Sequence, residues 1–420
     1  MTSRRGLLLL FMLTSLSLPR AWAGSGGSAY SIAGVGDVRY YQSIRSAGMG
    51  STGLALHSPL FINAVTPAAW ARIDRAMLEA GVLYEGFTST DGTNSRFLAT
   101  TDFNGGMLAF PISEANGIVF GGGFMPYSNV DYDTYTKGSY VSPQDTFPYS
   151  LHETGLGGLG RGRAGLSYAP LKGLALGATF DYIFGSIEGT LDQISTSEGY
   201  RGGNVEQRRK TNGVTWTFGL IYDGFGELAS PLGPLSLGGY VTTKGYLSTT
   251  YQTIYQYTTG RDTSAEIEGT LTLPLRYGVG IGYQIGSRVL LAADYEAQPW
   301  SKAEFNGQQL ENVRDSYRIG VGAEILASRT PTASWFLRTA YRLGFSYGAT
   351  YYEFSGQPIN EWSVTGGIDF PFSGLTRLGL AVEYGGRGTT EAGLIKDKFI
   401  RVSLSINIGE EWFVRPEEED

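Results

Sequence analysis

The chain has 420 residues and a formal net charge of −7, with 61 glycines and 27 tyrosines but no cysteine and only two histidines. The negative balance argues against a nucleic-acid-binding protein, which needs a basic surface. The absence of cysteine excludes disulfides and thiolate metal sites, and two histidines are too few for a His-based metal site. No side-chain pattern singles out a nucleophile, so the sequence predicts neither an enzyme nor a cofactor.

Residues 1–23 have the layout of a secretory leader. Arg4 and Arg5 precede the apolar run 6–13, and Ala21 and Ala23 supply the small residues that signal peptidase requires. We therefore expect the mature chain to begin at Gly24. No later stretch approaches the eighteen or more apolar residues of a membrane helix. An exported chain without such a helix is either a soluble secreted protein or a β-barrel.

Residues 24–74 are predicted to form a plug around which a closed sheet is built. Between Ser43 and Ile73 the apolar residues come in short clusters broken by glycines and Pro59, which is too apolar for a linker and too irregular for a strand. An exposed N-terminal arm is the alternative. The apolar plug residues could line a ligand pocket or form the plug's own core. They are Met49, Leu54, Leu56, Leu60, Phe61, Ile62 and Trp70.

Residues 75–409 alternate between apolar and polar positions. In the last segment every second residue from Ile400 to Ile408 is aliphatic, and those between are polar. Such segments are long for a globular protein and exceed the nine to eleven residues with which a tilted strand crosses a bilayer. We predict fourteen strands: 75–86, 102–113, 117–132, 156–170, 174–192, 207–224, 235–252, 264–285, 288–301, 315–327, 335–353, 360–372, 376–386 and 396–409.

The faces opposite the aliphatic rows repeatedly carry charge. In a barrel these side chains would face the lumen, where mutual pairing is the default because an unpaired confined charge is costly. One arginine could instead meet a ligand carboxylate, since guanidinium offers bidentate geometry. The charged positions are Arg276, Arg318, Glu324, Arg338, Arg342, Asp369, Arg377, Glu383 and Arg401.

The connections between predicted strands alternate in length. Short ones such as 113–116, 170–173 and 372–375 alternate with long polar ones such as 86–101, 133–154 and 195–205, although 224–234 and 328–334 are longer than this pattern expects. Short turns at one rim and long loops at the other are typical of outer-membrane barrels. The predicted fold is all-β, a 14-stranded antiparallel transmembrane β-barrel with the plug in its lumen. Residues 410–420 would form an acidic periplasmic tail.

Three places in the sequence resemble the FadL-like family of outer-membrane transporters for long-chain fatty acids and aromatic hydrocarbons. Residues 46–56 followed by Thr66-Pro67-Ala68-Ala69 resemble its Gly-rich hatch, which ends in an Asn-Pro-Ala motif. Gly121-Gly122-Gly123 with Pro126 and Tyr132 resembles its third strand. Residues 273–279, followed by Ala293-Asp294-Tyr295 and Trp300-Ser301, resemble its mid-barrel hairpin.

The resemblance implies a kink in the third strand, through which an apolar ligand leaves sideways into lipid. The residues concerned are Gly121, Gly122, Gly123 and Pro126; the alternative is that these glycines make room for the plug. The chain departs from the family at Thr66, which replaces the motif asparagine, while Asn63 lies three positions earlier. No basic residue can be carried over as a carboxylate ligand.

The sequence thus predicts a Gram-negative outer-membrane channel for passive uptake of hydrophobic small molecules, such as long-chain fatty acids, with the ligand bound near the plug. Its expected partners are membrane lipid and that ligand. The alternative from another class is a barrel that anchors or helps assemble surface or secretion machinery. A porin for polar solutes is a third reading, against which the plug is an obstacle.

Overall fold

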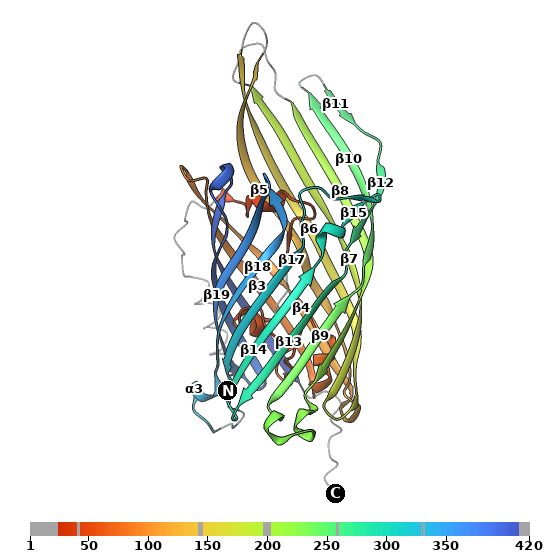
Figure 1. The fold of residues 1–420 in the computed structure, drawn as a ribbon, viewed down its shortest axis with the longest axis vertical. Helices are drawn as coiled ribbons and strands as arrows, with labels where there is room; N and C mark the ends of the chain where they lie inside the picture. Colours follow the sequence, from red (N-terminus) through yellow and green to blue (C-terminus); the bar gives the residue numbers. More distant parts are fainter. Residues whose placement is uncertain are drawn as a thin grey trace, which may run out of the picture.

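The computed structural model describes residues 24–39, 43–141, 146–195, 203–257, 260–328, 330 and 332–410. Its strands form one antiparallel cylinder that closes where the last strand, β21, pairs with the first long one, β3. Two positions around the wall are each filled by a broken strand, β9 with β10 and β12 with β13, which gives fourteen wall strands. The predicted fold class is confirmed (Figure 1).

The wall strands are β3 (Ala76–Thr90), β4 (Ser95–Ser113), β5 (Ile118–Val141), β6 (Thr146–Leu171), β7 (Leu174–Ser195), β8 (Asn204–Tyr222), β9 (Leu235–Thr242), β10 (Gly245–Tyr257), β12 (Ile267–Leu273), β13 (Arg276–Ile285), β14 (Val289–Gln298), β17 (Ser316–Ile325), β18 (Ala340–Phe354), β19 (Gln357–Ser373), β20 (Thr376–Gly388) and β21 (Lys396–Glu410). Short strands are β1 (Gly24–Ser25), β2 (Asp37–Val38), β11 (Gly260–Thr263), β15 (Glu304–Phe305) and β16 (Gln308–Gln309).

The helical pieces are short. They are α2 (Ile44–Ala47), α3 (Trp335–Arg338), and the 3-10 turns η2 (Ala29–Ile32), η3 (Pro67–Arg72), η4 (Glu114–Asn116), η5 (Gly224–Glu227), η6 (Ser230–Leu232), η7 (Trp300–Lys302) and η8 (Glu391–Gly393). Among the described residues, no helix is long and apolar enough to cross a membrane.

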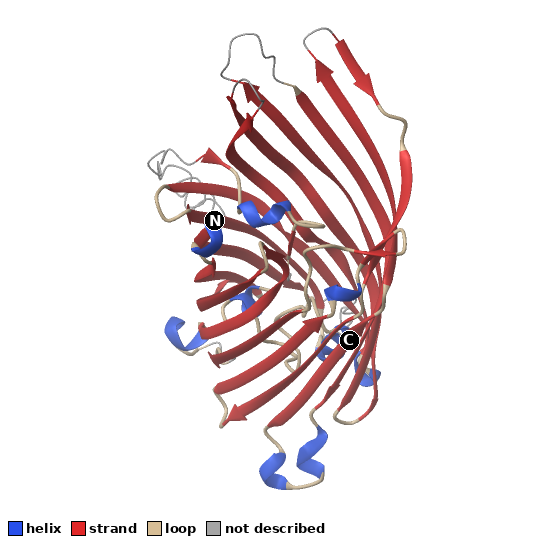
Figure 2. Cartoon of the chain, turned by 45° about the horizontal axis from the view of Figure 1, so that its top comes forward, coloured by secondary structure: helices blue, strands red, loops and turns tan. Residues whose placement is uncertain are grey.

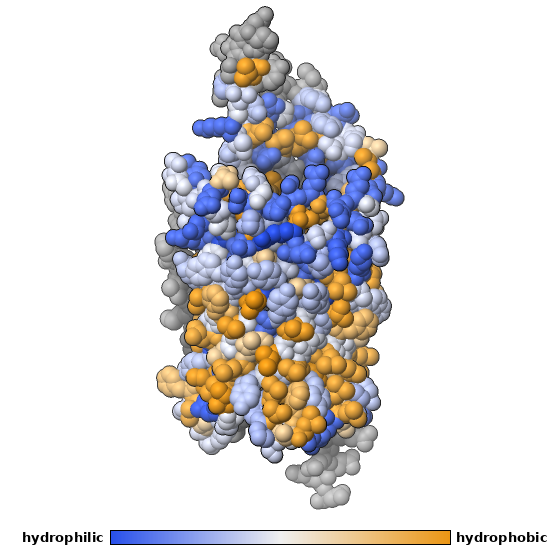
Figure 3. All heavy atoms as spheres, in the orientation of Figure 1, coloured by the Kyte–Doolittle hydropathy of each residue, from blue (hydrophilic) through white to orange (hydrophobic). Residues whose placement is uncertain are grey.

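Alternation along each strand separates a lipid-facing side from a lumen-facing side. On β21, Leu404 is 51 % exposed while its neighbour Ser403 is 8 % exposed. Glu324 of β17 and Arg342 of β18, on the opposite face from the aliphatic rows, are buried inside the cylinder. Figure 3 shows apolar side chains gathered over the lower part of the outer surface, with polar ones above. The aliphatic rows therefore form a belt on the outside of the barrel.

The wall is much taller on one side than on the other. β5, β6 and β7 contain 24, 26 and 22 residues, and at about 3.3 Å per residue each is far longer than a bilayer crossing requires. The long loops predicted over 86–101 and 133–154 were wrong, because the ladders β3–β4 and β5–β6 continue into both segments. In Figure 1, β5, β6 and β7 rise above the opposite wall.

The segment after the N-terminal strands lies inside the cylinder. α2 contacts β19, β20 and β21, while η3 contacts β5 to β8 on the other side of the barrel. Figures 1 and 2 show this part of the chain within the ring of strands. Met49, Trp70 and Ala68 are fully buried there. The interior of the barrel is therefore filled across its width.

A charge placed on the lipid-facing side should destabilise the barrel. Leu404→Arg lies halfway along the aliphatic row of β21, and an arginine near the bilayer midplane costs about 2–4 kcal/mol. We expect a lower urea midpoint for refolding into lipid vesicles, with Thr88→Arg, at an exposed position near the upper end of β3, as the matched control. Equal midpoints for the two variants would contradict the assignment of the belt.

Candidate functional site

Asn63 holds the interior segment in its folded form. Its Nδ2 donates to the carbonyl oxygens of Gly53 at 2.8 Å and Leu56 at 3.3 Å. Its Oδ1 accepts from the backbone N–H groups of Val65 at 2.9 Å and Thr66 at 3.0 Å. The backbone carbonyl of Asn63 also accepts from Trp70 Nε1 at 2.7 Å. Although Thr66 occupies the position of the motif asparagine, Asn63 supplies an amide that ties the two halves of the segment together.

Wall side chains bind the backbone of this segment from several directions. The Asp294 carboxylate accepts from the N–H groups of Gly53 and Leu54 at 2.6 and 2.9 Å. On the opposite side, Arg163 Nη1 donates to the carbonyl of Ala64 at 2.5 Å, and its other nitrogens bind Asp181. The sequence analysis did not single out Arg163 or Asp181. Both residues could have been found from the sequence, because Arg163 lies between Gly162 and Ala164 and Asp181 lies between Phe180 and Tyr182, which are positions of alternating strands.

Of the seven apolar residues predicted for the plug, six are buried and Leu60 is half-buried, but they do not converge. Met49 and Leu56 pack with Leu290 of β14, whereas Ile62 and Trp70 pack with residues of β3, β4 and β5. Phe61 packs with Ile44 and Ala381 in a third cluster. The cavity that Leu54, Leu56, Phe61 and Ile62 help to line has a volume of only about 30 Å³. These side chains mainly join the interior segment to the wall.

The lumen charges predicted from alternation form ion pairs. Arg276 and Arg318 both contact Glu296, the first at 2.7 Å. Arg342 contacts Glu324 at 2.8 Å, and Arg45 of the interior segment reaches the other oxygen of Glu324 at 2.7 Å. Farther up, Arg401 binds Glu85 at 2.7 Å, Glu361 at 3.1 Å and Glu383 at 3.4 Å, and near the lower rim Arg377 pairs with Asp369.

Arg338 is the exception among the predicted lumen arginines. The prediction of a strand over 335–353 was wrong at its start, because Trp335–Arg338 forms α3 and the strand begins at Ala340. The backbone carbonyl of Arg338 accepts from Arg377 Nη2 at 3.1 Å. Trp335 and Leu337 are two residues apart, which fits one face of a strand, but these residues form a single helical turn instead. Arg338 therefore lies at the rim and outside the lumen-facing rows.

The residues predicted as a strand kink lie beside an opening in the sheet. Gly121, Gly122 and Gly123 are fully paired to both β4 and β6. A Cβ at Gly121 would lie 2.7 Å from the Trp70 ring, so this glycine makes room for the interior segment. The irregularity falls farther along, at a register shift between Pro126 and Ser128. The ladder between β4 and β5 ends at the pair Gly106 and Phe124.

Above this last pair, the N-terminal segment fills the space between the two strands. We call residues 24–39 the strap. β1 pairs in parallel with β4 at Leu98 and Ala99, and β2 pairs with β5 at Ser128 and Asn129. The Gly27 N–H also donates to the Asp131 carbonyl at 2.9 Å. The barrel wall between β4 and β5 is therefore completed by the strap, and we call this part of the wall the seam.

The strap is fastened to the opposite wall through Asp37. Arg387 Nη1 reaches both Asp37 oxygens, at 2.7 and 2.8 Å, and the Tyr352 hydroxyl donates to Asp37 at 3.1 Å. Burial alone would raise the pKa of the Asp37 carboxyl, but the Arg387 guanidinium outweighs it and holds that pKa below its ordinary value. The Tyr351 hydroxyl adds bonds to the carbonyls of Ala33 and Gly36, both at 2.7 Å.

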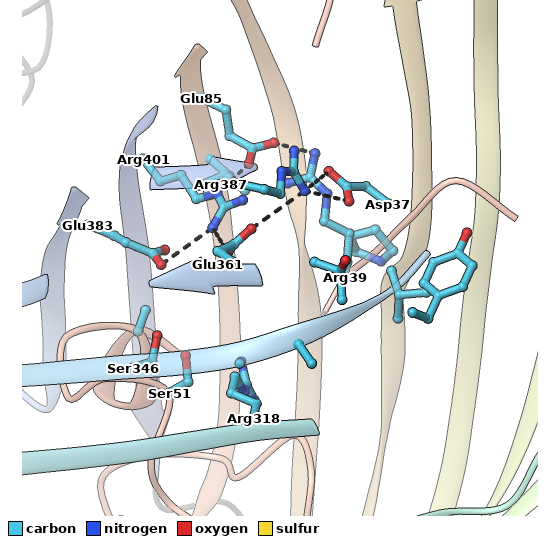
Figure 4. A pocket seen from close by; sticks show the side chains of 18 of the residues that line it. Asp37, Arg39, Ser51, Glu85, Arg318, Ser346, Glu361, Glu383, Arg387 and Arg401 are labelled. Atoms are coloured by element: carbon cyan, nitrogen blue, oxygen red, sulfur yellow. Dashed lines mark hydrogen bonds and ion pairs between the residues drawn. The ribbon is translucent and has the colours of Figure 1, made fainter. Parts of the chain in front are cut away.

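A cavity of about 160 Å³ lies beneath the strap (Figure 4). Its charged lining consists of four carboxylates and four arginines, namely Asp37, Glu85, Glu361, Glu383, Arg39, Arg318, Arg387 and Arg401. Its apolar lining includes Leu83, Tyr351 and Tyr352. Asn104 of β4 and Pro126 of β5 also line it, one on each side of the seam. The cavity thus reaches the wall where the β4–β5 ladder is interrupted.

The two histidines lie apart. His57 Nε2 lies 3.3 Å from Asp223, and burial lowers the pKa of His57 to about 4 against the opposing effect of Asp223. His152 contacts Asp133 at 2.9 Å on the extended part of β6. No group of three or more potential metal ligands occurs among the described residues.

The closed wall, the aliphatic belt and the filled lumen define a membrane-spanning barrel of the FadL-like fold. Solved structures agree with this class. The Ralstonia pickettii toluene transporter TbuX shares 15% identity over 87% of this chain and 97% of its own, with a TM-score of 0.58. The CymD monoaromatic hydrocarbon channel shares 16% identity over 89% of this chain and 98% of its own, with a TM-score of 0.58. A Pseudomonas aeruginosa FadL homologue shares 14% identity over 88% of this chain and 99% of its own, with a TM-score of 0.57. The predicted resemblance is confirmed.

The family is given by a match over nearly the whole sequence. The BamG family model matches residues 3–417, and the chain belongs to the BamG family. No curated protein matches the sequence.

Loss of the Asn63 amide should loosen the interior segment. Asn63→Ala removes four hydrogen bonds, each worth about 0.5–1.5 kcal/mol net. We expect a heat-modifiable, folded barrel with several-fold higher ion conductance in planar bilayers than the wild type. Asn116→Ala, at an exposed turn where the amide binds only Ser113, is the control and should conduct like the wild type. Unchanged conductance of Asn63→Ala would refute the role given to this amide.

Proposed function

We propose that the protein is an outer-membrane channel for the passive passage of small hydrophobic molecules, which leave the cavity sideways through the seam between β4 and β5. The observation that carries this proposal is that Asn104 and Pro126 line the cavity and flank the interruption of the ladder. The strap pairs with β4 and with β5 over two residues each, and adds single backbone hydrogen bonds from Gly27 to Asp131 and from Arg39 to Tyr127. The wall could therefore open there without breaking a long ladder.

The outer surface beside the seam is suited to apolar molecules. Phe103 of β4 and Phe124 of β5 stack there with centroids 6.4 Å apart and are 51 % and 43 % exposed. Phe184 lies 5.9 Å from Phe124, and Tyr182 lies 5.4 Å from Phe184. Aromatic side chains are favoured at the boundary between lipid and water. A molecule leaving at the seam would meet this aromatic surface before it meets lipid.

The cavity favours a compact ligand. An apolar cavity of about 150 Å³ accommodates a benzene-sized molecule, and the cavity here measures about 160 Å³. Four arginines and four carboxylates line it, so its formal charges balance and a neutral ligand meets no net charge. Size therefore supports a single-ring compound over a long acyl chain. The neighbours described as toluene and monoaromatic hydrocarbon transporters fit this substrate class.

Locking the strap should stop passage. The chain has no cysteine, so Val38→Cys with Ser128→Cys would introduce one specific disulfide between the paired residues of β2 and β5. We expect at least a tenfold loss of labelled toluene uptake by cells carrying the oxidised protein, with recovery after reduction.

A control pair separates this effect from oxidation itself. Val382→Cys with Val402→Cys joins β20 and β21 at paired positions on the outer face, away from the seam. That variant should take up toluene normally in both redox states. Full uptake through the oxidised strap variant would exclude the seam as the exit.

A second candidate function, an anchor or assembly partner for other envelope proteins, is favoured by the two long connections at the lower rim. One carries α3, where Phe336 is 70 % exposed beside Trp335 and Leu337. The other carries η5 and η6, with Leu228 73 % exposed. Figure 1 shows both connections at the same end of the barrel. Exposed aromatic and aliphatic side chains of this kind suit a protein interface.

Co-purification tests this second function. If α3 holds a partner, the tagged wild type should retain one protein in fixed ratio from native membranes, and Trp335→Ser with Phe336→Ser should lose at least nine-tenths of it. Leu171→Ser, at an exposed turn elsewhere on the lower rim, is the control and should retain the partner. If the wild type purifies without a partner, the anchor function is rejected, and the exposed side chains of α3 are then assigned to contact with lipid.

A further inference from the structure

Arg161 of β6 is a buried cation without a carboxylate of its own. The residue is 8 % exposed. Among the described residues, no carboxylate oxygen lies within ion-pair distance of its guanidinium, and its one side-chain hydrogen bond runs from Nη2 to the sulfur of Met125 at 3.0 Å. Its Nε has no hydrogen-bond partner. A buried guanidinium in this state costs several kcal/mol unless something compensates its charge.

The nearest carboxylate is already engaged. Asp181 accepts from Arg163 Nε at 2.6 Å and Nη2 at 2.8 Å. It also accepts from the hydroxyls of Thr217 at 2.7 Å and Thr179 at 3.2 Å. All the directions from which a carboxylate accepts are therefore occupied. Arg161 and Arg163 share one negative charge between them, which leaves this pair of arginines with an excess of one positive charge.

The neighbouring cluster repeats this imbalance. Arg276 and Arg318 both bind Glu296, and the Tyr240 hydroxyl donates to the same carboxylate. Asp294, two residues before Glu296, is turned towards the interior segment, where it accepts the N–H groups of Gly53 and Leu54. With Asp294 engaged there, Asp181 and Glu296 are the two carboxylates left for the four guanidinium groups of Arg161, Arg163, Arg276 and Arg318, and the local potential favours an anion.

Arg161 lines an enclosed space of about 20 Å³. This space lies behind the two breaks in the wall, between β9 and β10 at Thr243 and between β12 and β13 at Pro274. The motif Leu273-Pro274-Leu275-Arg276, which the sequence analysis singled out, forms the second break. Arg276, Gln298, Thr215, Thr242 and Thr243 give the rest of its polar lining, and Tyr127, Ile183 and Leu273 also line it. The space holds one particle of about the size of water, for which about 10–15 Å³ is sufficient.

We infer that this space is a binding site for one halide-sized anion, such as chloride, held by Arg161. The anion would accept from the Arg161 guanidinium and balance its positive charge. A carboxylate with a chain attached is too large for the space. Gln298 donates from Nε2 to the Pro274 carbonyl at 3.1 Å, and its Oε1 has no partner. The inference does not depend on the proposed transport function.

Bromide provides a direct test, because it replaces chloride and scatters anomalously. We expect one anomalous peak within about 3.5 Å of the Arg161 guanidinium in crystals grown with bromide, and none in Arg161→Met. In chloride-free gluconate buffer at equal ionic strength, the Tm of the wild type should fall by a few degrees relative to chloride, since an anion bound only to the folded state stabilises it. Arg161→Met should show no difference between the two buffers.

Two further variants separate the anion site from a structural role of the arginine. Gln298→Glu places a carboxylate in the same space, so its Tm should no longer respond to chloride and it should show no bromide peak while remaining folded. Lys210→Met removes an exposed charge from the neighbouring β8 and should respond to chloride like the wild type. A wild type with a water molecule at Arg161, no bromide peak and equal Tm in both buffers would overturn the inference.

Discussion

The structure depends on the pairing of charges inside the barrel. Arginines and carboxylates alternate with small residues on the inner faces of the strands, and almost every one reaches a partner on another strand or on the interior segment. Because a single buried charge is costly whereas a satisfied pair is tolerated, these contacts fix the position of the interior segment more specifically than apolar packing could. Arg161 is an exception to this pairing, and the space beside it is the proposed anion site.

The same interior contacts determine how the wall is completed. β4 and β5 separate above Gly106 and Phe124, and an open ladder would expose unpaired backbone groups. The strap supplies these groups with partners while Asp37 and Tyr351 tie it to the far wall. Long strand ladders close most of the barrel wall, and the strap closes the remaining part between β4 and β5. The cavity reaches the wall at this part, where the fewest backbone hydrogen bonds join the strands.

The cavity and the lower rim of the barrel support two different proposed functions. A balanced, partly apolar cavity of single-ring size beside an aromatic surface fits the passage of compact hydrophobic molecules. The exposed α3 and the η5–η6 connection have no part in that passage. The BamG family assignment covers both regions, since the match extends over residues 3–417. The two proposed functions, passage of small molecules and attachment to a partner, therefore draw on separate parts of the molecule.

The sequence determined the barrel. Period-two alternation such as Ile400 to Ile408 places aliphatic side chains on one face of a strand and polar ones on the other, because side chains alternate along any strand. Strand length and the alternation of short and long connections indicated that the aliphatic face meets lipid. The sequence could not determine the pairing of Arg401 with Glu85, the insertion of the strap between β4 and β5, or the substitution of Asn63 for the motif asparagine. The sequence assigned the irregularity of β5 to the three glycines and Pro126, and the register shift lies beside the last of these. These features join residues far apart in the chain, so only the closed tertiary structure brings their partners within reach.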